Sequence, residues 1–220
     1  MSYVTVRIGS WFSRMWLVAV FAGLMALSGC WVESINGLDE GRFLGPADHD
    51  RTFEPALVGT WQTQSDNCMV TLSITAEKDQ YTWRETVEGE GCSDNNGKKE
   101  LYYLSTVYKL DKHLFLDLTA RPEDVCDELC RAIHMIFLVQ IDKDSFTMAP
   151  IDSEWLKSSI EAKTVTLSTM SDDTDIITAT PKELKAFCRK YADDKEAFKL
   201  APGFKFSRKS APAPASETHR

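Results

Sequence analysis

Residues 68–87 read CMVTLSITAEKDQYTWRETV, two runs of alternating apolar and polar side chains separated by a short turn-prone segment. In the first run Val70, Leu72 and Ile74 share one side of an extended chain, and the residues between them are mostly polar. This period of two is typical of a strand with one face on a core, and two such runs in succession indicate antiparallel pairing.

The same pattern recurs along much of the chain. Besides Cys68–Thr75 and Gln80–Val87, we expect strands at Val58–Thr63, Glu100–Leu110, His113–Thr119, Ile133–Ile141, Ser145–Pro150, Thr164–Thr169, Asp175–Ala179 and Gly203–Arg208. Short strands at such regular spacing favour an antiparallel barrel or sandwich, and closing the barrel removes exposed edges. The expected fold is therefore mainly β, an antiparallel barrel of about eight or nine strands.

Helical patterns interrupt the strands. Thr180, Pro181 and Glu183 have the positions of an N-cap, a first helical residue and a capping-box acid, which predicts a C-terminal helix reaching about Asp193. A short inserted helix is expected at Glu154–Ala162, capped by Ser153. Pro122–Arg131 is interpreted as a short acidic helix or helical loop.

The first thirty residues have a composition of their own. Arg7 and Arg14 precede an apolar run at Met15–Leu27. A positive segment followed by a short apolar core is typical of a secretory signal, and this run is shorter than the ~20 residues that a membrane-spanning helix needs. We therefore expect residues 1–29 to be a signal peptide.

Leu27-Ser28-Gly29-Cys30, at the end of the apolar run, resembles the lipobox of bacterial lipoproteins. This resemblance implies cleavage before Cys30 and acylation of its thiol and amino group, with the membrane as a partner through that residue. Several acyl chains give stable anchoring where one does not. In such lipoproteins an Asp directly after the acylated cysteine favours retention in the inner membrane. This chain has Trp31 at that position, so we expect it in the outer membrane, with the domain facing the periplasm.

Composition limits what the mature chain does. The formal net charge of −8 becomes about −10 once Arg7 and Arg14 are removed with the signal, which excludes an electrostatic attraction to nucleic acid. Residues 30–56, with several glycines, are interpreted as the lipidated cysteine and a linker. Residues 57–209 form the domain, and residues 210–220 are expected to be a disordered tail.

Gly59-Thr60-Trp61 opens the first strand, as Gly-x-Trp does in lipocalins, and the order of barrel, helix and last strand is similar to that family. The resemblance implies that Trp61 closes one end of the barrel and is covered by an arginine, for which Arg208 is the candidate. Two departures are the missing Thr-Asp-Tyr-like motif and the helix at Glu154–Ala162.

Five cysteines follow Cys30, and an exported location permits disulfides. Cys68 and Cys92 begin and follow a predicted hairpin, so this pair is expected to be bonded. Cys126 and Cys130 are four residues apart, too far for a disulfide on a regular helix. Either that turn is not a regular helix, or one of the two pairs with Cys188.

Cys126, Cys130 and His134 also form a candidate metal site, because thiolates and imidazole suit Cu(I) or Zn(II). The spacing resembles that of copper-delivery proteins of the bacterial envelope. Those proteins have a thioredoxin-like fold and a proline after the motif, where this chain has Arg131. We therefore expect no metal and no cofactor.

No catalytic motif with a recognisable spacing occurs in the sequence, so we expect no enzyme. The first functional hypothesis is an outer-membrane-anchored lipoprotein that binds a small apolar ligand or lipid inside its barrel. The alternative is a non-enzymatic structural or interaction component of the cell envelope, with another envelope protein as partner and a barrel filled by side chains.

Overall fold

The computed structural model describes residues 32–39, 48–65, 67–89, 92, 98–120, 133–170, 173–201 and 203–209. In chain order the elements are β1 (Glu33–Ser34), β2 (Arg51–Thr52), the 3-10 turn η1 (Pro55–Leu57), β3 (Gly59–Ser65), β4 (Cys68–Glu77), β5 (Gln80–Glu88), β6 (Lys98–Leu110), β7 (His113–Ala120), β8 (His134–Ile141), β9 (Ser145–Pro150), α3 (Ser153–Glu161), β10 (Thr169–Met170), β11 (Asp173–Ile177), α4 (Pro181–Tyr191) and β12 (Lys205–Arg208).

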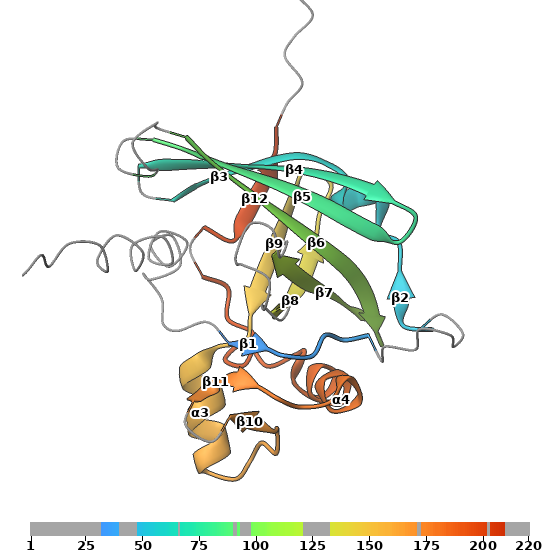
Figure 1. Cartoon of the computed structure of the whole chain (residues 1–220), viewed down its shortest axis with the longest axis vertical. Coiled ribbons are helices and arrows are strands. Elements are labelled where there is room, and N and C mark those ends of the chain that lie inside the picture. The colour runs from blue at the N-terminus through green and yellow to red at the C-terminus, as the bar shows by residue number, and fades with distance from the viewer. Residues whose placement is uncertain are drawn as a thin grey trace, which may run out of the picture.

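Eight of these strands close an antiparallel barrel, as expected (Figure 1). Strands β3 to β9 pair in sequence, and β12 closes the circle between β9 and β3. Where β4 pairs with β5, Val70 lies opposite Val87 and Ile74 opposite Trp83. All four side chains are buried, so the alternation in residues 68–87 sets which face of the hairpin lines the barrel.

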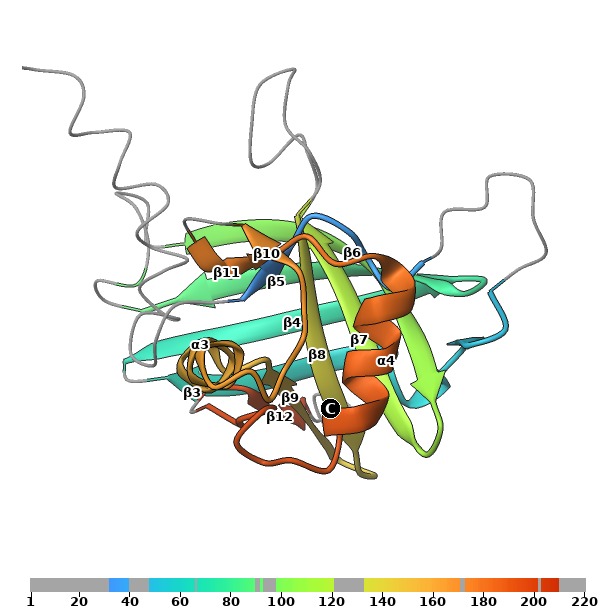
Figure 2. The same cartoon turned by 90° about the horizontal axis from the view of Figure 1, so that it is seen from below.

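A second core lies outside the barrel, where the outer faces of β6 to β9 meet the helices. Figure 2 shows α4 along the barrel wall and α3 beside it. Helix α4 begins as predicted, because Thr180 accepts from the backbone N–H of Glu183 and the Glu183 carboxylate accepts from the Thr180 N–H. The buried side of α4 carries Leu184, Phe187 and Cys188.

Parts of the expected linker belong to the folded domain. Strand β1 pairs with β8 and, in parallel, with β11, and β2 pairs with β6. Leu38 is fully buried, and Val32 lies in the same core as α4. Residues 32–39 therefore pack on the barrel through Val32 and Leu38 of the outer core, and residues 48–52 are held by strand pairing and by ion pairs with Lys185. The expected tail at residues 210–220 lies outside the described residues.

Two local predictions are wrong. Asp152, not Ser153, is the N-cap of α3, because the Asp152 carboxylate accepts from the backbone N–H of Trp155. Of the strand expected at Thr164–Thr169, only Thr169 lies in a strand. The N–H of Val165 donates to the carbonyl of Ser159 in α3 and pairs with no strand. Val165 and Leu167 are buried, as the alternating pattern predicted, but they form no strand pairing. The helix expected at Pro122–Arg131 lies outside the described residues.

Candidate functional site: the Trp61–Arg208 contact and an outer pocket

Trp61, near the start of β3, has a fully buried side chain. The indole Nε1–H donates to the Leu57 carbonyl over 2.8 Å. The Arg208 guanidinium lies 4.0 Å from the centre of the Trp61 ring and donates to the carbonyl oxygens of Ala56 (2.9 Å) and Val58 (3.2 Å). The family resemblance predicted that an arginine covers Trp61. The hydrogen bonds of Arg208 to the carbonyls of Ala56 and Val58 could not be predicted, because only the tertiary structure brings η1 close to β12.

Gly59 completes this group for a steric reason. Its φ of +140° is unfavourable for a residue with a side chain, and a Cβ there would lie 2.6 Å from Nη1 of Arg208. Gly59, Trp61 and Arg208 are therefore a single structural unit that joins β3, β12 and η1.

Inside the barrel, aromatic rings contact one another. Phe146 from β9 lies between Trp61 and Phe206, with ring centres 4.8 and 4.9 Å away, and its edge meets Trp83 at 6.2 Å. The Trp83 indole N–H donates to the buried Ser105 hydroxyl over 2.7 Å, so this buried indole N–H has an acceptor.

The cysteines fall into three groups. Cys68 and Cys92 form the expected disulfide. Cys188 is a free thiol buried in α4, so the expected alternative of a disulfide to Cys188 is wrong; burial raises the pKa of this thiol. Cys30, Cys126 and Cys130 lie outside the described residues.

His134, the third residue of the candidate metal set, is held by a carboxylate. Its Nδ1 lies 2.7 Å from Oδ1 of the buried Asp117, and Oδ2 of Asp117 accepts from the Leu38 N–H over 2.7 Å. Sequence reasoning missed Asp117, because it lies in the middle of a strand with no motif around it. Within the described part of the chain, no group of three or more His, Cys, Asp or Glu side chains is placed to hold a metal ion.

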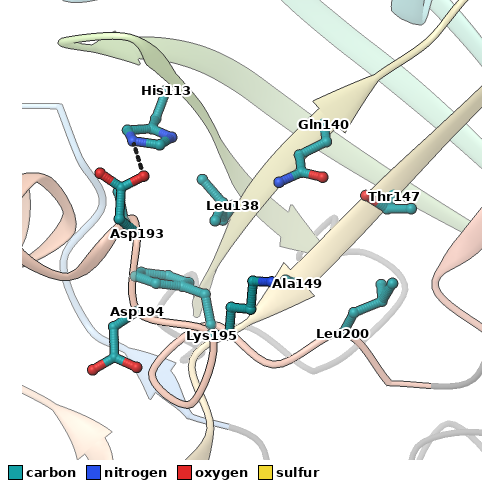
Figure 3. A pocket seen from close by; sticks show the side chains of 11 residues that line it. His113, Leu138, Gln140, Thr147, Ala149, Asp193, Asp194, Lys195 and Leu200 are labelled. Carbon is teal, nitrogen blue, oxygen red and sulfur yellow. Dashed lines mark ion pairs between the residues drawn. The ribbon is translucent and has the colours of Figure 1, made fainter.

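A pocket of about 290 Å³ lies on the outside of the barrel, between β8 and β9 and the chain that follows α4 (Figure 3). Leu138 and Ala149 form part of its wall, and Phe198 lines it from the opposite segment. At its rim, His113 Nε2 lies 3.2 Å from an Asp193 carboxylate oxygen. The pKa of Asp193 is lowered, first by a hydrogen bond from Lys112. This mixture suits a small molecule with an apolar body and polar ends.

A cluster of ion pairs links α4 to the segment before the barrel. Lys185 contacts Asp48 at 2.5 Å and Asp50 at 2.9 Å, and Arg189 pairs with Asp50 at 2.9 Å. Burial of Asp50 acts to raise its pKa, but the hydrogen bonds and charges of Lys185 and Arg189 outweigh it and lower the pKa. For Lys185, burial acts to lower the pKa, and the two aspartates reverse this and raise it. The cluster joins residues 48–50 to α4.

None of the helices in the described ranges is long and apolar enough to cross a bilayer. Comparisons of the chain with protein-family models, with curated proteins and with solved structures find no match.

Proposed function

We propose that this chain is a lipid-anchored, non-enzymatic protein of the bacterial envelope, whose side-chain-filled barrel serves as a rigid structural or interaction module. The observation that carries the proposal is the packing of Phe146 against Trp61, Trp83 and Phe206 inside the barrel. An eight-stranded barrel is narrow enough for side chains to fill it. The lipobox at Cys30 supports the anchoring.

The contacts favour this function over that of a barrel that carries a lipid. A ligand site inside the barrel needs a few hundred Å³ of free volume. Phe146 of β9 instead contacts Trp83 of β5, four strands away around the barrel, and Phe204, just before β12, packs 6.0 Å from Phe137 of β8. Ring contacts between facing walls support a barrel without room for a lipid.

Native mass spectrometry of the purified protein tests the filled barrel. We expect the mass of the polypeptide with its acyl chains and no other compound. A hydrophobic compound that co-purifies in a fixed ratio and is lost on denaturation would contradict the proposal and support the lipid carrier.

A cavity-forming variant sharpens this test. Phe146→Ala removes the ring at the centre of the cluster, so the variant should bind benzene, as dry apolar cavities do. The wild type should bind none. Phe53→Ala is the control, since the Phe53 side chain is about half exposed and its removal opens no cavity. Benzene binding by the wild type equal to that of Phe146→Ala would contradict a filled barrel.

The outer pocket supports a second candidate function, capture of a small amphiphilic molecule. Its volume of about 290 Å³ lies near the lower limit of ligand pockets. A screen of small amphiphiles by ligand-observed NMR should find compounds that bind the wild type. Ala149→Phe should abolish their binding, because the new ring projects from the wall and fills the pocket. Ala162→Phe, at the exposed end of α3, should leave binding unchanged. Equal binding by both variants would exclude this pocket.

A further inference from the structure

We propose that the surface around Met170, where β1, β10 and β11 meet, rests on the bilayer to which the chain is anchored. This inference rests on the proposed acylation of Cys30 and adds an orientation to it. Strands β1, β10 and β11 lie together on the side of the barrel that also carries α3 (Figures 1 and 2).

The segment that follows the anchor is fixed to the domain from its first described residues. Val32 is buried, and the Ile35 N–H donates to the Ile177 carbonyl over 3.0 Å. The Asn36 side-chain amide donates to the Ala179 carbonyl over 3.0 Å, and the N–H of the fully buried Leu38 donates to Asp117. Residues 32–38 are therefore part of the folded domain and cannot act as a flexible linker between the bilayer and the barrel.

Covalent geometry then limits how far the acyl chains can be. Two residues separate Val32 from Cys30, and an extended chain covers at most ~3.6 Å per residue, so the two Cα atoms lie within about 7 Å. An acylated Cys30 therefore holds the N-terminal end of β1 at the membrane interface.

The parallel pairing of β1 with β11 identifies the neighbouring surface. Glu33 is in register with Ile176, and Asp173, three residues before Ile176, pairs with Met170 on β10. Because β1 and β11 are parallel, Asp173 and Met170 lie beyond the N-terminal end of β1. With strands ~4.8 Å apart and only β11 between β1 and β10, Met170 lies about two strand spacings to the side of β1.

Met170 has the exposure and chemistry for this contact. Its side chain is 46% exposed, and an apolar side chain so near the acyl chains gains free energy by entering the headgroup–acyl boundary. The surface around Met170 therefore contacts the same bilayer that holds the acyl chains of this molecule. The acidic net charge of the chain gives no electrostatic attraction to anionic lipid, so the contact depends on the covalent anchor.

Photo-crosslinking of the full-length protein in its native membrane tests the orientation. Met170→p-benzoylphenylalanine places a photoreactive group at the proposed contact. Met69→p-benzoylphenylalanine is the matched control, because Met69 is 38% exposed and lies on β4. In the closed barrel β4 is four strands from β8, the strand that β1 joins, so it lies on the opposite side.

We expect several-fold more lipid adducts at position 170 than at position 69. A third variant inserts about twelve Gly and Ser residues between Trp31 and Val32, which allows a root-mean-square separation of ~20 Å. This insertion should reduce the adducts at position 170 to the level of the control.

The intact mass separates the two ways of failing. A mature chain without acyl chains on Cys30 would overturn the anchoring and the orientation together. An acylated chain with equal adducts at both positions, or with adducts that survive the insertion, would overturn the orientation alone.

Discussion

At the scale of single residues, Arg208 makes two kinds of contact that one lysine cannot reproduce together. Its planar guanidinium lies over Trp61 and donates to two carbonyl oxygens of neighbouring loop residues, whereas an ammonium is a compact point charge. Arg208→Lys should therefore lower the free energy of unfolding by about 1–2 kcal/mol, measured by urea denaturation.

Arg84→Lys is the matched control for this substitution. Arg84 pairs with Glu100 on the surface of the barrel, with about half of its side chain exposed, and exposed pairs contribute little to stability because water screens them. Equal losses in the two variants would show that the contacts of Arg208 with Trp61 and the two carbonyls add no stability beyond that of a surface pair.

Cys188 should be unreactive in the native protein. Burial raises the pKa of its thiol, so the thiolate that attacks an alkylating reagent is scarce and inaccessible. We expect no labelling of Cys188 by iodoacetamide at neutral pH and complete labelling in denaturant, measured on the peptide that contains Cys188. Rapid labelling under native conditions would mean that α4 opens locally.

At the scale of elements, Lys185 attaches α4 to the segment before the barrel. Its side chain and that of Asp48 are almost completely buried, with 5% and 10% exposed. Lys185→Met keeps the packing but leaves a buried carboxylate without its cation, which should cost about 3 kcal/mol in urea denaturation. Lys182→Met, on the exposed side of the same helix, should change stability by less than ~0.5 kcal/mol.

The same cluster predicts a dependence on acid. The folded pKa of Asp50 is lowered from its ordinary 3.8, so the native state binds fewer protons than the unfolded state near that pH. The stability from this pair is therefore present above pH 3.8 and lost as pH falls through the lower, folded pKa. The stability difference between wild type and Asp50→Asn should shrink with acidification in urea titrations from about pH 7 to pH 3. A constant difference would contradict the lowered pKa.

At the scale of the whole molecule, the disulfide between Cys68 and Cys92 closes a loop with a sequence separation of 24 residues. A crosslink of this length stabilises by about 3 kcal/mol, mainly by restricting the unfolded chain. The double variant Cys68→Ser/Cys92→Ser should lose about that much in urea denaturation. A reductant should destabilise the wild type and leave the double variant unchanged; destabilisation of both would implicate another disulfide.

The sequence by itself determined the β-rich class, the side of β4 that faces the core, the cap of α4 and the disulfide. These features depend on short-range periodicity, on local capping chemistry or on a hairpin that brings two cysteines together. The alternation at Val165 and Leu167 misled the prediction, because burial against a helix end produces the same pattern as a ladder.

Only the tertiary structure decided the rest. The docking of residues 32–39, the burial of Lys185 between two aspartates and the pairing of His134 with Asp117 join segments distant in sequence. A polar residue such as Lys185 carries no mark of burial in the sequence, because the charges that offset its desolvation lie more than a hundred residues away. The aromatic contacts inside the barrel have the same origin: Phe146, Phe206 and Trp61 are ordinary apolar residues until closure brings β9, β12 and β3 side by side.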